Sequence, residues 1–342
     1  MKVFNIMLAS GKGGLEQMAV VYAKALVNAG NETHCLVVDN CSYKEDMIKT
    51  GAIVHTTKTR NLYNIFNIIK ILKLIKEQQT DIVICHGNRA MSIVLNKLSR
   101  LFVKSIFKTI GVMHSKNCPY KNRIDNLVFL TDTFFNEQTL DIQKKSFILA
   151  NTILDESYPQ VALHSPIVFG AMGRLHQVKG YDILLSAISK LHKKGLDFKF
   201  VLGGTGPDEE NLKQQAKELG LQSVVEFIGW VGDKKAFFDK IDAFVLSSRS
   251  ERMPLVILET FAYSKAIIST NCQGPNEVVA QLPSHLIVPT EDVDALASAM
   301  ETLLTNPQKV SQMAQEGNDL FNAKYNLEIF QQNLNSILKK CI

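Results

Sequence analysis

The chain has 342 residues, of which 46% are hydrophobic and 21% charged, so it is long enough for two domains of ordinary globular composition. No apolar run reaches the ~18–20 residues that cross a bilayer, and the six cysteines lack the spacing of a zinc site, which favours free thiols in a reducing cytosol. The net charge of +5 is uneven, because residues 1–165 hold 20 Lys and Arg against 13 Asp and Glu. This excess predicts an anionic partner for the N-terminal half.

Short apolar segments alternate with longer segments of helical composition. The predicted strands are residues 2–8, 33–38, 81–85, 108–113, 127–131, 146–149, 166–171, 198–203, 224–228, 243–247, 266–270 and 285–288. The predicted helices include residues 15–29, 61–78, 88–104, 180–194, 208–219, 254–264 and 291–304. Because these strands are apolar throughout, we expect α/β architecture with parallel sheets covered on both faces.

The segment 150–166 has few periodic apolar positions and ends at Ser165-Pro166, which predicts a linker between two doubly wound domains. We place the N-terminal domain at residues 1–155 and the C-terminal domain at residues 166–320. The last helix, 325–342, is expected to pack back on the N-terminal domain. Ligands of such sheets bind at the carboxyl ends of the strands, so we expect the site in a cleft between the domains.

A glycine-rich turn, Ser10-Gly11-Lys12-Gly13-Gly14, follows the first predicted strand. It looks like a P-loop, but Leu15, and no Ser or Thr, follows the glycines, so we exclude an ATPase. Glycines at a strand-to-helix turn still offer backbone N–H groups to a phosphate or a sugar.

Two histidines, His86 and His114, each follow a predicted strand. A lone histidine in this place is more often a structural hydrogen-bonding group than a catalyst. Their position at carboxyl ends of strands favours function. His114 is the stronger candidate, because the irregular segment 115–122 after it is typical of an active-site loop.

Two predicted helices of the N-terminal half carry many cations. Polar residues recur every three positions in 61–78, so they wind around that helix and predict one that covers the sheet. Lys97, Arg100 and Lys104 instead fall within ~60° of one another on a continuous helix. This stripe fits the phosphates of an acceptor or a membrane, and a solvated surface is the alternative.

Arg174 and Lys179 follow the strand 166–171, and Lys179 directly precedes a predicted helix. Two cations beside the positive end of a helix suit a diphosphate leaving group, whose charge must be stabilised as a glycosyl bond breaks. The alternative is a pair of surface cations at a turn, and both interpretations stand here.

Gly203, Gly204 and Gly206 end the strand 198–203. Glycine lets backbone approach a ligand closely or adopt a positive φ. A tight turn before the next helix explains the same residues equally well.

Glu251 follows the strand 243–247, and Glu259 lies within the next predicted helix. Carboxylates accept hydrogen bonds from the vicinal hydroxyls of a ribose or a hexose. Glu259 has apolar neighbours, and an unpaired buried carboxylate would be costly, so we favour a function over a solvated helix position.

In these residues the chain resembles the retaining family 4 glycosyltransferases, which have the GT-B architecture of two Rossmann-like domains facing across a cleft. The resemblance covers most of the chain and is strongest over residues 169–279. It implies that Arg174 and Lys179 contact the donor diphosphate. It also implies that Glu251 lies near the transferred sugar and that Glu259 binds the nucleotide ribose.

In the N-terminal domain the resemblance implies that Gly13 and Gly14 approach the donor phosphates and that His114 lies near the transferred sugar. We assign donor binding to Gly13, Gly14, Arg174, Lys179, Gly204, Gly206, Glu251, Leu255 and Glu259. We assign catalytic roles to His114, Glu251, Arg174 and Lys179. Members of the family usually act without a metal, so we expect no metal and no cofactor.

The chain departs from the family pattern at two positions. Arg252 stands where a glycine usually follows the first glutamate, and Ser264 replaces another usual glycine. Arg252 could narrow the sugar pocket or reach a charged donor or acceptor, so the departure leaves the identity of the donor open.

The expected activity is transfer of a sugar from a nucleotide diphosphate donor, a UDP-sugar, to an acceptor hydroxyl with retention of configuration. We expect a saccharide or anionic glycolipid acceptor from lipopolysaccharide or other cell-surface glycan synthesis. The expected place is the cytoplasm, with peripheral contact to the inner membrane and no nucleic-acid partner. The alternatives are another GT-B enzyme, such as a sugar-nucleotide epimerase, and a non-catalytic relative that binds a nucleotide sugar.

Overall fold

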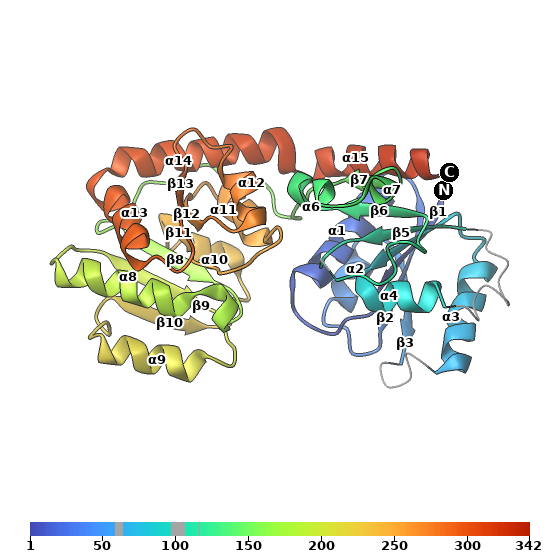
Figure 1. Ribbon diagram of the computed structural model, residues 1–342, viewed down its shortest axis with the longest axis horizontal. Helices are drawn as coiled ribbons and strands as arrows, with labels where there is room; N and C mark the ends of the chain where they lie inside the picture. Colours follow the sequence, from blue (N-terminus) through green and yellow to red (C-terminus); the bar gives the residue numbers. More distant parts are fainter. Residues whose placement is uncertain (59–63, 97–106, 116) are drawn as a thin grey trace. The chain divides into compact units, whose positions relative to one another are not determined.

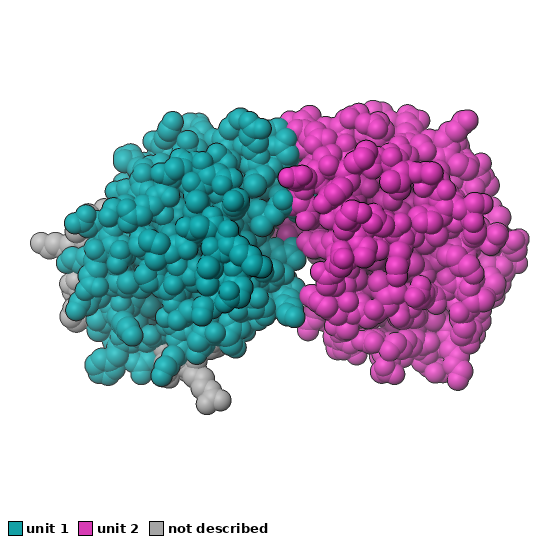
Figure 2. Space-filling view, turned by 180° about the vertical axis from the view of Figure 1, so that it is seen from behind, with its two compact units in different colours: residues 1–154, 325–342 teal, residues 155–324 magenta. Residues whose placement is uncertain are grey.

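The structure, a computed structural model, describes residues 1–58, 64–96, 107–115 and 117–342. The chain forms two compact units, which Figure 2 shows in different colours. Unit 1 comprises residues 1–154 and 325–342, and unit 2 comprises residues 155–324. Each is built on one parallel sheet with helices packed against it, which confirms the predicted α/β class (Figure 1).

Unit 1 contains a seven-stranded sheet of order β3-β2-β1-β4-β5-β6-β7. Its strands are β1 (Lys2–Met7), β2 (Glu32–Val38), β3 (Ile53–Thr57), β4 (Ile82–His86), β5 (Lys108–Val112), β6 (Asn126–Phe129) and β7 (Ser146–Ile148). Its described helices are α1 (Gly14–Asn28), α2 (Lys44–Lys49), α3 (Ile65–Glu77), α4 (Gly87–Val94), α6 (Asp132–Asn136), α7 (Leu140–Gln143) and α15 (Leu327–Cys341).

Unit 2 contains a six-stranded sheet of order β10-β9-β8-β11-β12-β13. Its strands are β8 (Val168–Met172), β9 (Lys199–Gly203), β10 (Val225–Gly229), β11 (Ala243–Leu246), β12 (Ala266–Thr270) and β13 (Leu286–Val288). Its helices are α8 (Tyr181–Lys193), α9 (Glu209–Glu218), α10 (Lys234–Phe238), α11 (Leu255–Ala262), α12 (Gln273–Val279), α13 (Val293–Thr305) and α14 (Pro307–Leu320). A short 3-10 turn, η2 (Gln177–Lys179), precedes α8, and a π-helical turn, η3 (Phe321–Tyr325), follows α14.

The strand order reverses direction once in each sheet, between β1 and β4 in unit 1 and between β8 and β11 in unit 2. At such a switch point the loops after neighbouring strands separate, and doubly wound sheets bind their ligands there. In unit 1 the turn 10–14 follows β1, and His86 is the last residue of β4. The segments 173–180 and 247–254 follow those of unit 2.

All twelve predicted strands are present, with ends within two residues of the predicted ones. Strand β3 was missed, because it lies at the sheet edge and exposes Ile53 by 51%, so its sequence has no continuous apolar run. Helix α14 was missed although Asn306 caps it and a proline occupies its first turn, both of which are start signals.

Helix α3 corrects the prediction that polar residues wind around the segment 61–78. Its described part buries one apolar face, made by Ile68, Ile71, Leu72 and Ile75, in the core of unit 1. Lysines lie on the opposite, exposed face. The four apolar positions recur at helical spacing, and their burial decides which way the helix faces. Lys97, Arg100 and Lys104 lie outside the described residues.

The chain leaves unit 2 through η3 and returns to unit 1 as α15, which packs against α1 (Figure 1). Phe330 of α15 meets Tyr22 of α1 edge to face, with ring centroids 5.1 Å apart. Nearby, the Thr152 hydroxyl donates a hydrogen bond to the Tyr325 carbonyl oxygen. The two segments of unit 1 therefore share one core. Within the described part of the chain, no helix is both long and apolar enough to cross a membrane.

Candidate active site

The loop after β8, residues 173–180, holds both predicted cations of unit 2. Gly180 has a φ of +65°, and a Cβ atom there would lie 2.1 Å from the Ser247 carbonyl oxygen, so only glycine fits. The Ser247 hydroxyl also donates to the Lys179 carbonyl oxygen at 2.9 Å. The backbone carrying Lys179 is therefore held against the loop after β11.

Lys179 forms an ion pair with Glu251 across these two loops. The Lys179 and Glu251 side chains are 22% and 14% exposed, and the Ser248 hydroxyl donates to the same carboxylate oxygen at 2.9 Å. Two residues that the sequence assigned to different parts of a donor are thus in direct contact. Both retain enough exposure for a ligand to reach them.

Arg174 is exposed and makes no hydrogen bond or ion pair with any residue that the structure describes. Its place is nevertheless fixed, because the next residue is held by two backbone hydrogen bonds. The Leu175 amide donates to Thr205 at 2.9 Å, and the Leu175 carbonyl accepts from Asp208 at 3.1 Å. The guanidinium is therefore available to an anion.

Gly204 and Gly206 lie where the loop after β9 meets the loop after β8. Gly204 has a φ of +132°, and a Cβ atom there would lie 1.9 Å from the Gly173 carbonyl oxygen. A Cβ atom on Gly206 would lie 2.1 Å from the Leu175 carbonyl oxygen. Close backbone packing accounts for both glycines, so contact with a donor remains a proposal for them.

Glu259 is buried in α11, where its exposed fraction is 3%, and it forms an ion pair with Lys234 at the start of α10. Burial raises the pKa of the Glu259 carboxyl, and the positive charge of Lys234 partly offsets that rise. Leu255 is buried in the first turn of the same helix. The sequence analysis missed Lys234, because no spacing rule links residues in separate helices.

The glycine turn of unit 1 is closed by its own helix. Gly13 is the N-terminal cap of α1, Gly14 is the first residue of that helix, and the Gly13 amide donates to a Glu16 carboxylate oxygen at 3.2 Å. A Cβ atom on Gly11 would lie 2.8 Å from the other carboxylate oxygen. A phosphate at this turn would have to share or displace the Glu16 carboxylate.

The two histidines of unit 1 are in contact with each other. His114 Nε2 lies 3.2 Å from His86 Nδ1, and His86 Nε2 lies 2.8 Å from Asn5 Oδ1. Burial lowers the pKa of His114 to about 4 and that of His86 well below its usual range. Both rings are therefore neutral near pH 7, and His86 has a structural partner on each side.

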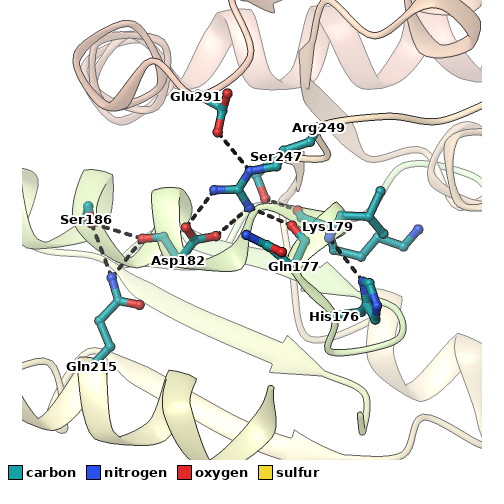
Figure 3. Close-up of polar contacts among 10 residues, drawn as sticks. His176, Gln177, Lys179, Asp182, Ser186, Gln215, Ser247, Arg249 and Glu291 are labelled. Carbon is teal, nitrogen blue, oxygen red and sulfur yellow. Dashed lines mark hydrogen bonds and ion pairs between the residues drawn. The ribbon is translucent and has the colours of Figure 1, made fainter. Parts of the chain in front are cut away.

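A second residue that the sequence analysis missed, Arg249, ties the loop after β11 to the start of α8 (Figure 3). Its guanidinium binds both carboxylate oxygens of Asp182 at 2.8 and 2.7 Å and donates to the Gln177 carbonyl at 2.6 Å. Its Nε donates to Glu291 at 3.0 Å. The hydrogen bonds from Arg249 hold the pKa of the Asp182 carboxyl below its usual value.

Known proteins resemble this chain along nearly its whole length. Residues 156–319 match the family described as "Glycosyl transferases group 1". The lipopolysaccharide core biosynthesis glycosyltransferase LpsE of Rhizobium meliloti (strain 1021) is 24% identical over 324 residues, which cover 92% of this chain and 93% of that protein. LpsD of the same strain is 26% identical over 338 residues, covering 95% and 94%. These matches identify the chain as a glycosyltransferase whose residues 156–319 carry the group 1 match.

The fold of this glycosyltransferase agrees with that assignment. The crystal structure of Anabaena Alr3699/HepE in complex with UDP and glucose matches it with a TM-score of 0.84 at 15% identity, covering 99% of each chain. The lipopolysaccharide outer core galactosyltransferase WaaB, in its apo form, matches with a TM-score of 0.76 at 16% identity, covering 100% of each chain. These matches and the two parallel sheets confirm the GT-B fold.

One departure of the glycosyltransferase from the family pattern has a clear structural setting. Ser264 has a φ of +50°, a left-handed conformation in which glycine is the ordinary residue. Its hydroxyl donates to the Tyr158 carbonyl oxygen at 2.5 Å, which helps to hold the serine in that conformation. The other departure is Arg252. A Cβ atom on Gly274 would lie 1.1 Å from the Arg252 carbonyl oxygen, so the backbone at Arg252 packs directly against a glycine.

We expect Arg249→Lys and Asp182→Asn to lower the turnover of the glycosyltransferase on the order of 10-fold to 100-fold. Either change removes the bidentate contact between Arg249 and Asp182, which orients residues 177–182. Lys179 would then lose its fixed position. Steady-state assays at saturating donor measure the effect. Lys213→Ala, which removes an exposed pair with Glu209 on α9, is the control and should keep full activity. Unchanged turnover in both Arg249→Lys and Asp182→Asn would show that Arg249 only stabilises the fold.

Proposed function

We propose that the protein transfers a sugar from a nucleotide diphosphate donor, a UDP-sugar, to a hydroxyl of a saccharide or glycolipid acceptor, with retention of configuration. The observation that carries the proposal is the switch point of unit 2. There Arg174 is exposed and has no partner among the residues that the structure describes, and Lys179 and Glu251 form a partly exposed pair. Complexes of a similar fold with UDP and glucose support the donor class. The relatives named for lipopolysaccharide core biosynthesis support the acceptor class.

The chemistry asked of these residues is stabilisation of a leaving group. As the bond from the anomeric carbon to the diphosphate oxygen breaks, negative charge grows on the diphosphate. Arg174 and Lys179 would neutralise that charge, and Glu251 would lie near the transferred sugar. We propose that the acceptor proton passes to the donor's own phosphate, so that no separate protein base is needed.

We propose that Glu259 binds the ribose of the nucleotide. Its carboxylate can accept hydrogen bonds from the two ribose hydroxyls, and its burial makes an unpaired charge there expensive. Lys234 supplies the compensating charge in the free protein. A ribose would add two hydrogen-bond donors to a carboxylate that is already held in place.

The acceptor is proposed to be an anionic glycolipid reached at the cytoplasmic face of the inner membrane. Supporting this, residues 58–124 hold 13 Lys and Arg against Glu77 and Asp81. Helix α3 exposes Phe66 by 78%, and Lys70 and Lys73 lie on the same exposed side. Cations beside an exposed aromatic ring suit an acidic lipid surface.

A thermal-shift panel of UDP-, GDP- and ADP-sugars tests the donor assignment. A donor present at about 100 times its Kd should add about 2.7 kcal/mol to the free energy of unfolding. We expect a UDP-sugar to raise the melting temperature most. If no nucleotide sugar raised it, the proposed function would be wrong.

The donor that binds then serves in a transfer assay, with and without EDTA, and NMR of the product reports its anomeric configuration. We expect the product to retain the anomeric configuration of the donor. We also expect EDTA to leave the activity unchanged, because the proposed charge stabilisation comes from Arg174 and Lys179. Conversion of the donor to another sugar nucleotide without any acceptor would identify an epimerase instead.

A further inference from the structure

Three side chains of unit 1, Asn5 on β1, His86 at the end of β4 and His114 after β5, form a continuous hydrogen-bonded row. We propose that Asn5 and His86 are positioning residues that fix His114 as the neutral tautomer protonated on Nε2. His114 then presents Nδ1 as a lone pair, which can only accept a hydrogen bond. The inference rests on the proposed function for one point alone, that the group reaching Nδ1 is a sugar hydroxyl.

Asn5 determines which groups donate and which accept along the row of hydrogen bonds. Its side-chain nitrogen, Nδ2, donates to the Ala19 carbonyl oxygen of α1 at 2.8 Å. A carbonyl oxygen can only accept, so the amide group cannot be turned the other way without placing two oxygens together. Asn5 Oδ1 therefore faces His86 Nε2 at 2.8 Å. Because an amide oxygen can only accept, His86 Nε2 carries a proton.

The protonation of His86 determines which nitrogen of His114 carries a proton. The His86 ring is 2% exposed, packs edge to face on Tyr22 with centroids 4.7 Å apart, and has no ion pair with a described carboxylate. Burial without a counter-charge keeps it neutral, so its second nitrogen, Nδ1, has a lone pair. That lone pair accepts from His114 Nε2 at 3.2 Å, which makes His114 Nε2 the protonated nitrogen.

The remaining nitrogen of His114 decides what the site can bind. Burial also keeps the His114 ring neutral, so Nδ1 has a lone pair and no proton. A lone pair attracts a hydroxyl hydrogen and repels the oxygen of a phosphate or a carboxylate. The residue as a whole is intermediate in burial, and we propose that its Nδ1 edge is the part that a ligand reaches. His114 is therefore suited to a neutral sugar hydroxyl and unsuited to the diphosphate or to an acidic substituent.

Nitrogen-15 NMR of the full chain with labelled histidine tests the tautomers without any ligand. At neutral pH we expect both His86 and His114 to show a protonated Nε2 and an unprotonated Nδ1. Single His→Gln variants at the two positions assign the signals. A proton on Nδ1 of His114, or a cationic His114 ring, would overturn the proposal.

Two variants test whether Asn5 and His86 cause the tautomer. Asn5→Leu removes the group that sets the direction, and His86→Phe breaks the row while keeping an aromatic ring beside Tyr22. In both we expect His114 to populate its two tautomers together. The hydrogen-bonded pair His34–His55, 3.0 Å apart in the same unit, reports on folding and should keep its signals. If His114 kept a single tautomer in both variants, Asn5 and His86 would not be positioning residues.

Probe ligands separate this inference from the proposed function. UDP-glucose and GDP-mannose are compared with UDP and GDP, with binding measured by thermal shift. We expect a bound nucleotide sugar to shift His114 Nδ1 in the direction of an accepted hydrogen bond, and the bare nucleotide to leave it unchanged. Binding of a nucleotide sugar without that shift would overturn the inference but not the function. If neither sugar bound, the function would be in doubt, while the tautomers of the free protein would still stand.

Discussion

Lys179→Ala is expected to lower the turnover number of sugar transfer by about 10²–10³-fold while changing donor affinity far less. The lysine faces Glu251 in the free protein, so its charge is already balanced before the donor arrives. Its contribution grows only when the diphosphate gains charge in the transition state, and a contact that strengthens there raises turnover more than binding. Rapid-quench or steady-state assays at saturating donor, with donor affinity measured by calorimetry, separate the two effects.

Two further variants make this result specific. Lys179→Arg keeps the positive charge and should retain more activity than Lys179→Ala. Lys194→Ala removes a lysine that pairs with Glu301 at 2.6 Å on the surface of the same unit, and it should leave turnover unchanged. A loss confined to donor affinity in Lys179→Ala would contradict the leaving-group role.

The strands of the core could be predicted because burial on both faces leaves a continuous apolar run. Strand β12, for example, is buried at every position. The same rule fails for β3, because only one of its five residues is buried. The short helices α10 and α12 also escaped, since five and seven residues give no helical period to detect. Sequence patterns therefore indicate the sheets better than the short elements between them.

The sequence predicted individual residues of the candidate site, but not the ion pairs that they form. Lys179 precedes Glu251 by 72 positions and Lys234 precedes Glu259 by 25, so no local spacing links the partners. The first pair forms because β11 lies beside β8, although β9 and β10 come between them in the chain. Arg249 was overlooked for the same reason, since Asp182 lies 67 positions before it. Strand order, which periodicity does not reveal, brings Lys179 to Glu251 and Asp182 to Arg249.

Glu259→Ala is expected to weaken donor binding by about 10-fold to 100-fold, with little change in turnover at saturating donor. Hydrogen bonds to a charged group are worth about 1.5–3 kcal/mol, and the ribose hydroxyls would lose theirs in both the ground state and the transition state. Glu259→Gln keeps the shape and one acceptor, so its affinity should lie between those of Glu259→Ala and the wild type. Calorimetric titration with the donor and with the bare nucleotide measures the loss, which should be equal for the two ligands.

Lys234→Met separates the ribose role of Glu259 from its place in the fold. Removing the lysine leaves a buried carboxylate without its partner, which should destabilise unit 2 by about 1–3 kcal/mol, more than Glu259→Gln does. The carboxylate itself remains, so donor affinity should fall less than in Glu259→Ala. Equal donor affinity in Glu259→Ala and the wild type would remove the ribose role. The ion pair with Lys234 would then explain why a carboxylate is buried in α11.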